Sequence, residues 1–90
     1  MTPRLRRQID SDFPDAGDEI ERLLAAARSD NQDRERVLAA IVFIADGDVA
    51  RLGQAIALSQ LDWRDLLVNG GLANADWPQV LDARLSPPAP

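Results

Sequence analysis

The stretch that decides the fold is Val37-Leu38-Ala39-Ala40-Ile41-Val42-Phe43-Ile44-Ala45, the longest uninterrupted apolar run of the 90-residue chain. A helix that is apolar on every side is typical of the buried centre of a helical bundle. The β-branched and aromatic residues of the run would also suit a strand. A strand needs a partner, however, and no other segment alternates apolar and polar residues with period two. We therefore predict a buried central helix over residues 32–45.

The N-terminal segment has the pattern of a short helix. Thr2 is a good N-cap, and Pro3 occupies the first helical position, where its missing N–H group is tolerated. Leu5 and Ile9 are four residues apart and would share one face. We expect this helix to end near Phe13-Pro14, because the residue before a proline avoids the helical conformation.

A second helix is predicted from residues 14–18 to about residue 28. Acidic residues crowd its first turn, where they compensate the helix dipole. Its apolar residues recur at the spacing of one helical face. They are Ile20, Leu23, Leu24 and Ala27. Residues 29–31 are predicted to form the loop before the central helix.

Asp46-Gly47-Asp48 separates the central helix from the next one. Gly47 can adopt the left-handed conformation that ends a helix, and Asp48 can cap the helix that follows. This helix is predicted over residues 49–60, and one of its faces combines Val49, Leu52, Ala55, Ile56 and Ser59. Gly53 destabilises it by about 1 kcal/mol relative to alanine, so we predict that a neighbouring helix approaches closely at Gly53.

A local repeat follows, in which Leu61-Asp62-Trp63-Arg64-Asp65-Leu66-Leu67 is echoed by Ala75-Asp76-Trp77-Pro78-Gln79-Val80-Leu81. In each copy the first aspartate can cap a helix that begins at the tryptophan. Leu61 and Leu66 also have the spacing of a hydrophobic staple, which predicts contact between them. The fifth helix should end at Asn69-Gly70-Gly71, and the sixth should run to about residue 85.

These elements together predict an all-α fold, a compact bundle of five or six short helices around a buried central helix. We expect a single helical domain over residues 1–85 and a disordered, Pro-rich tail over residues 86–90. The chain has no cysteine. A core of this size must therefore hold the fold without disulfides, alone or with the help of a partner.

Charge and composition indicate whether the protein binds nucleic acids, whether it contacts a membrane and where in the cell it is found. The net charge is −5, and an acidic domain is repelled by phosphate backbones, so nucleic-acid binding is disfavoured. The N-terminus lacks the apolar region of a signal peptide, and the apolar run is too short to cross a membrane. We predict a cytoplasmic protein without membrane contact, and its all-arginine, alanine-rich usage is typical of a high-GC bacterial genome.

The chain contains no His, Cys, Lys or Tyr, and all ten of its basic residues are arginines. The missing types supply most general bases, covalent nucleophiles and soft metal ligands. We therefore predict a protein that is not an enzyme and that uses no cofactor and no metal. Asp10, Asp12 and Glu21 have the spacing of a calcium loop, but Pro14 and Asp15 stand where such a loop needs a ligand and a glycine.

Two alternatives stay open. The helix pair over residues 48–69 has the size of a helix-turn-helix, so a small DNA-binding regulator is one alternative. Its second helix would enter the groove with Asp62 and Asp65, which suits DNA poorly. A carboxylate-based metal-binding protein is the other alternative.

The favoured function is a non-enzymatic protein–protein interaction module that binds a protein partner or forms a homodimer. Trp63 and Trp77 could pack into the core at helix ends, or they could anchor a partner, since tryptophan and arginine are enriched at binding hot spots. The candidate interaction surface consists of Trp63, Arg64, Asp65 and Trp77.

Gly47-Asp48-Val49-Ala50-Arg51-Leu52, followed by Asp62-Trp63-Arg64-Asp65-Leu66-Leu67, resembles the signature of a family of small uncharacterised bacterial proteins. That signature reads Gly-Asp-x-x-x-Leu and then Asp-Tyr/Trp-Arg-Asp-Val/Leu-Leu. The resemblance covers about half of the chain and implies a helical fold without an assigned activity. Many members continue with an aromatic residue and a proline, where this chain has Asn69-Gly70-Gly71-Leu72. The shared residues would be Asp48, Leu52, Asp62, Trp63, Arg64 and Asp65.

Overall fold

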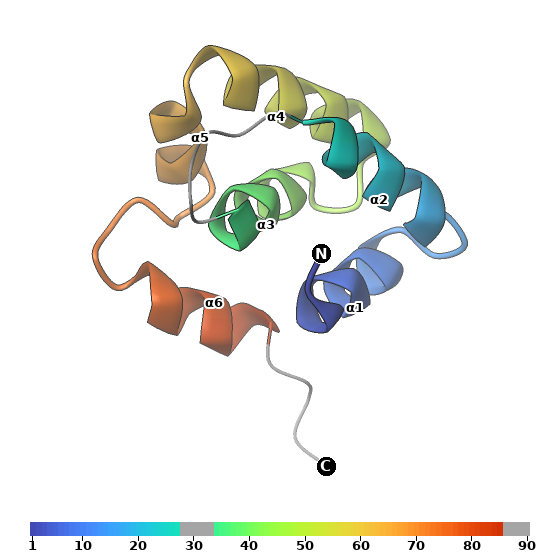
Figure 1. The fold of residues 1–90 in the computed structure, drawn as a ribbon, viewed down its shortest axis with the longest axis horizontal. Helices are drawn as coiled ribbons and strands as arrows, with labels where there is room; N and C mark the ends of the chain where they lie inside the picture. The colour runs from blue at the N-terminus through green and yellow to red at the C-terminus, as the bar shows by residue number, and fades with distance from the viewer. Residues whose placement is uncertain (28–33, 86–90) are drawn as a thin grey trace.

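The predicted central helix is α3 (Arg34–Ala45), which lies in the middle of the molecule (Figure 1). Residues 37–42 are all buried, and so is Ala45. Helices α1, α4, α5 and α6 pack against it. Because other helices cover it from several sides, most of its apolar residues are buried, and Phe43 and Ile44 are half-buried. The predicted central helix is confirmed from residue 34 onward, and its buried part begins at Val37.

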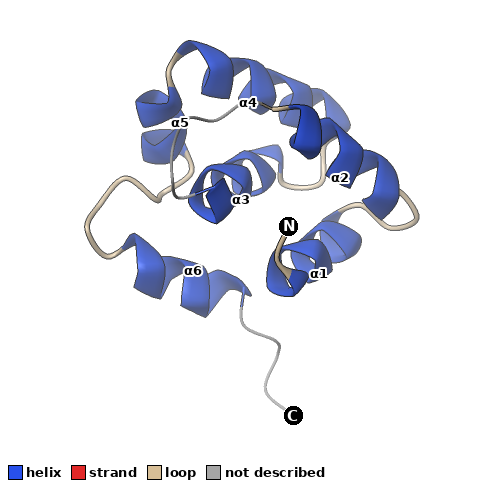
Figure 2. Cartoon of the chain, in the orientation of Figure 1, coloured by secondary structure: helices blue, strands red, loops and turns tan. Residues whose placement is uncertain are grey.

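The computed structural model describes residues 1–27 and 34–85, which form six helices and no strand (Figure 2). This confirms the all-α fold class and the compact bundle. The predicted loop over 29–31, the predicted start of the central helix at residue 32 and the predicted tail over 86–90 lie outside these residues. Besides α3, the helices are α1 (Pro3–Asp12), α2 (Gly17–Ala26), α4 (Val49–Leu61), α5 (Trp63–Asn69) and α6 (Trp77–Leu85).

Short polar side chains cap α1, α4 and α5, as predicted. The Asp48 carboxylate accepts hydrogen bonds from the backbone N–H groups of Ala50 (2.8 Å) and Arg51 (3.2 Å) at the start of α4. Asp62 does the same for the first turn of α5, and Thr2 caps α1. Gly47 takes the predicted left-handed conformation, with φ of 82°. These caps satisfy backbone donors that have no partner inside the helix.

The N-terminal helices place one apolar face each against the core. Leu5 and Ile9 of α1 are fully buried, and Ile20 and Leu24 of α2 are buried as well. Leu23 was predicted to belong to the same stripe, but its side chain is exposed. Its position lies about 100° around the helix from Leu24, and the core contacts α2 over a narrower arc than the predicted stripe.

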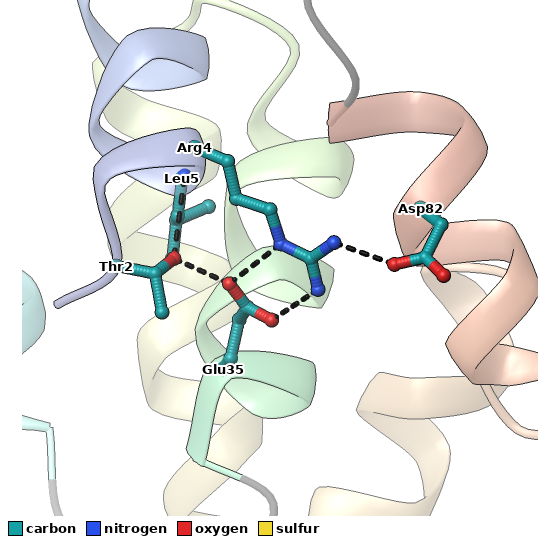
Figure 3. Close-up of polar contacts among 5 residues, drawn as sticks. All are labelled: Thr2, Arg4, Leu5, Glu35 and Asp82. Atoms are coloured by element: carbon teal, nitrogen blue, oxygen red, sulfur yellow. Dashed lines mark hydrogen bonds and ion pairs between the residues drawn. The ribbon is translucent and has the colours of Figure 1, made fainter.

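Arginines of α1 tie this helix to distant parts of the chain. The Arg4 guanidinium bonds the Glu35 carboxylate of α3 and, at 2.6 Å, the Asp82 carboxylate of α6 (Figure 3). The Thr2 hydroxyl donates to the same Glu35. The hydrogen bonds from Arg4 hold the pKa of Glu35 below its usual range, although burial opposes this shift. The cluster joins the first, third and sixth helices at one point.

The predicted role of Gly53 in α4 is wrong, whereas Gly70 ends α5 as predicted and also makes a close contact. Gly53 is exposed, and a Cβ atom added there would meet nothing within 4 Å, so the predicted close approach of a neighbouring helix of this chain is wrong. Close approach occurs instead at Gly70, where an added Cβ would lie 2.8 Å from the Cβ of Ala40. The end of α5 therefore rests directly on the backbone of α3.

Candidate functional site: the outer face of α4 and the start of α5

The outer side of α4 is exposed and uncharged. We call it the α4 face and define it by Val49, Ala50, Gly53, Gln54, Ala57 and Leu61, all of which are exposed. These residues recur at helical spacing, opposite the buried side of the same helix. Arg51, toward one edge, is the only charged residue among the 13 of α4, whereas 28% of the chain is charged. A solvated helix in this protein should carry several charges, so the α4 face is an exception.

Two large apolar side chains mark the ends of the α4 face. Val49 is 56% exposed at the first position of α4, and Leu61 is 86% exposed at the last. The predicted staple between Leu61 and Leu66 is therefore wrong, because Leu66 is fully buried while Leu61 projects into solvent. Only Asp62 separates α4 from α5. Leu61 thus ends α4 outside the core, one residue before α5 begins.

The start of α5, which follows α4 after one residue, is exposed as well. We call the exposed residues Trp63, Arg64, Asp65 and Val68 the α5 corner; Trp63 is 42% exposed and Val68 63%. The guanidinium carbon of Arg64 lies 5.3 Å from the centre of the Trp63 ring, within the range of a cation–π contact. Three of the four residues of the candidate interaction surface thus lie together on one helix start.

Trp77, the fourth candidate residue, lies elsewhere. It begins α6, and in Figure 1 α6 lies to the lower left of α3, whereas α5 lies to its upper left. Trp77 is half-buried and packs against the core, with the guanidinium carbon of Arg36 4.8 Å from its ring centre. Arg36 also donates a hydrogen bond of 2.8 Å to the Leu72 carbonyl. Trp77 and Arg36 therefore fasten the segment before α6 to α3.

The α4 face itself was missed by sequence reasoning. We assigned Val49 and Ile56 to the buried side with Leu52, but Val49 is exposed and Ile56 is only half-buried. The signal that could have found the face is the charge pattern, since α4 has a single charged residue and no acid. The spacing of the apolar residues in α4 predicts only one apolar face, and it does not predict that the opposite side of the helix is uncharged.

The clustered acids between α1 and α2 are engaged by Arg6. Its guanidinium bonds Asp10 (3.0 Å), Asp18 (2.9 Å) and also Glu21, and these bonds raise its pKa above the usual range. Two of the calcium-loop candidates, Asp10 and Glu21, are thus paired with an arginine. Within residues 1–27 and 34–85, no group of three or more His, Cys, Asp or Glu side chains is placed to hold a metal ion.

The second helix of the 48–69 pair, α5, is the one that would have to enter a DNA groove. Helix α5 has seven residues, which corresponds to a length of about 10 Å. Its first turn, the part that would enter a groove, carries Asp65 beside Arg64, and the Asp62 carboxylate caps it. A phosphate backbone approaching this turn would meet two carboxylates and one guanidinium.

No family model matches this chain, and neither curated proteins nor solved structures give a match. The resemblance of residues 47–67 to a bacterial family signature therefore stays a prediction. Among the helices of the described residues, none is both long and apolar enough to cross a membrane.

Proposed function

We propose that this chain is a non-enzymatic protein-binding module that docks another protein chain on the α4 face and the α5 corner. The observation that carries the proposal is the uncharged α4 face, bounded by the exposed Val49 and Leu61. Burying apolar surface is favourable by about 25 cal/mol per Å². A face without charges can be buried without the large penalty of desolvating unpaired ions.

The α5 corner supplies the residue types that anchor protein interfaces. Tryptophan and arginine are enriched among residues whose removal weakens binding most. The Arg64 side chain already lies over the Trp63 ring, so less rotamer freedom is lost when a partner covers it. Asp65 beside Arg64 offers a second polar contact of opposite sign at the edge of the apolar area.

The non-enzymatic part of the proposal is supported by composition and by the pairing of acids. No His, Cys, Lys or Tyr is available as base or nucleophile. A carboxylate pair that works as acid and base needs two different environments that separate its pKa values. Arg6 instead holds Asp10, Asp18 and Glu21 as ion-pair partners.

A site-specific photo-crosslinker tests the docking surface in cells. We would place the crosslinking amino acid at Ala57 in the middle of the α4 face, with Glu19 of α2 as an exposed control position. A discrete protein adduct is expected from Ala57 and not from Glu19. Identical adduct patterns from both positions, or no adduct from Ala57, would contradict the proposal.

A gel-shift assay at low salt addresses the DNA-binding alternative. We expect no binding of duplex DNA, because the chain carries a net charge of −5 and the start of α5 is acidic. Binding that weakens steeply with added salt would contradict the proposal, since such salt dependence reports contacts with phosphates.

A further inference from the structure

The chain joins an aspartate or asparagine to a following glycine at two places, and the two places differ in their surroundings. Asp46-Gly47 lies between α3 and α4, and Asn69-Gly70 lies at the end of α5. In such a pair the backbone nitrogen of the glycine can attack the side-chain carbonyl carbon of the preceding residue, because glycine has no Cβ to hinder the approach. We propose that Asp46 is a site of spontaneous backbone modification in the folded protein, whereas the fold protects Asn69.

The reaction at Asp46 needs no reactant besides water. The Gly47 nitrogen forms a bond to the Cγ atom of the Asp46 carboxyl group, the Cγ–OH bond breaks, and the amide proton leaves with the hydroxyl as water. A second water molecule then opens the resulting succinimide ring at either of its carbonyl carbons. One opening restores aspartate. The other gives isoaspartate, in which the main chain runs through the former side chain.

The described residues leave the reacting groups of Asp46 and Gly47 free to meet. Both residues are exposed. The Gly47 N–H donates no hydrogen bond within residues 1–27 and 34–85, and the Asp46 carboxylate accepts none there. Asp46 has φ of 47° and Gly47 has φ of 82°, so both lie in the left-handed region, past the end of α3. The Gly47 nitrogen is therefore held neither by a helical hydrogen bond nor by burial.

Asn69 has the more reactive side chain, because an amide is attacked more readily than an ionised carboxylate. The sequence alone would therefore place the modification at Asn69. Gly70, however, is buried, and its N–H donates a hydrogen bond of 2.9 Å to the Leu66 carbonyl. A Cβ added at Gly70 would lie 2.8 Å from the Cβ of Ala40, so the backbone has little room to turn toward the Asn69 side chain. Attack at Asn69 thus requires local opening of the end of α5.

The location of Asp46 gives the modification a consequence for the fold. Isoaspartate inserts the side-chain methylene into the main chain between α3 and α4. The turn there is closed by a hydrogen bond of 2.9 Å from the Asp48 N–H to the Ala45 carbonyl, and the Asp48 carboxylate caps α4. A longer main chain displaces both interactions. We therefore expect the modified protein to melt at a lower temperature, without a change in net charge.

Peptide mapping of the aged full chain tests this inference. Wild type is kept warm for a long period, folded in buffer and unfolded in urea, and then digested with trypsin, which cleaves after arginine. Residues 37–51 carry Asp46 together with Asp48, and residues 65–84 carry Asn69. Electron-transfer fragmentation separates isoaspartate from aspartate at each position. Asp48 is the internal control, because its carboxylate is held by the cap of α4.

The two sites should respond differently to folding. We expect isoaspartate at Asp46 to accumulate at a similar rate in the folded and in the unfolded chain. Asn69 should react at least about tenfold more slowly in the folded chain, because local opening costs free energy. If folding slows Asp46 as much as Asn69, or if Asp46 reacts no faster than Asp48 in the folded chain, the inference is overturned. The result does not depend on the proposed function, since no partner is needed.

Asp46→Glu is the matched variant for the consequence of the reaction, because its longer side chain would have to close a larger ring that forms more slowly. Circular dichroism before ageing checks that the variant is folded. The melting temperature of wild type should fall on ageing, whereas that of Asp46→Glu should stay unchanged. An equal fall in both proteins, or no fall in a wild type that contains isoaspartate, would contradict the structural role assigned to this turn.

Discussion

The apolar run of α3 and the outer face of α4 both lack charged residues, yet they occupy opposite environments. In α3, residues 37–42 are buried beneath the surrounding helices. In α4, Leu52, Ala55 and Ser59 face the core, while the α4 face is open to solvent. The comparison teaches that lack of charge does not by itself say whether a helix face is buried within the chain. The burial is internal for α3, and for the α4 face we propose that another chain provides it.

The largest expected effect is the difference in stability loss when a side chain is truncated in α3 and when one is truncated in α4. Ile41→Ala in α3 should lower the free energy of unfolding by about 2–5 kcal/mol, because it removes a fully buried side chain and leaves a cavity. Val49→Ala, which also truncates a β-branched residue, should change it by less than about 0.5 kcal/mol at the exposed end of α4. Urea denaturation of dilute protein measures both. Equal losses for the two variants would show that Val49 is part of the core.

A second comparison uses the two glycines. Gly70→Ala should lower stability by about 1–3 kcal/mol, because its Cβ would press on the backbone and Cβ of Ala40 in α3. Gly53→Ala should stabilise the dilute monomer by up to about 1 kcal/mol, because alanine favours the helix and meets no neighbour within 4 Å. Thermal melts at low protein concentration measure both changes. A destabilised Gly53→Ala monomer would contradict the open environment of this position.

The smallest expected effect concerns the ion pair that links α1 to α3. The pKa of Glu35 lies below its ordinary value of 4.5, chiefly through the hydrogen bonds of Arg4. A lowered pKa in the folded state means that the pair stabilises the protein above that ordinary value, and that this stabilisation is lost as the pH falls through the lowered pKa. Glu35→Gln should therefore reduce stability at neutral pH by no more than about 1 kcal/mol, since both side chains are partly exposed.

Unfolding curves from neutral to acidic pH measure this effect. The difference between wild type and Glu35→Gln should narrow below the pKa of Glu35. Glu19→Gln, at an exposed position of α2, is the control and should follow wild type closely. A difference that stays constant down to the lowest pH would mean that the Glu35 charge does not contribute.

The candidate site was predictable only in part. Trp63, Arg64 and Asp65 were correctly expected to lie together, because they are consecutive residues at one capped helix start. Trp77 belongs to the second copy of the repeat, and local sequence similarity does not reveal that Arg36 from a distant helix covers it. The repeat therefore encodes two similar helix starts, of which one faces solvent and the other packs against the core.

The sequence by itself determined the helices, their caps and the central position of α3. The helices and their caps depend on residues within one or two turns, such as Asp48 with the N–H groups of Ala50 and Arg51. The central position of α3 follows because a continuous apolar run is more stable when it is buried away from water. The tertiary structure alone decided that Arg4 bonds Glu35 and Asp82, which are 31 and 78 residues away. It also decided that Gly70, and not Gly53, contacts a neighbouring helix. Such contacts depend on how whole helices cross, and no local pattern specifies which faces will meet.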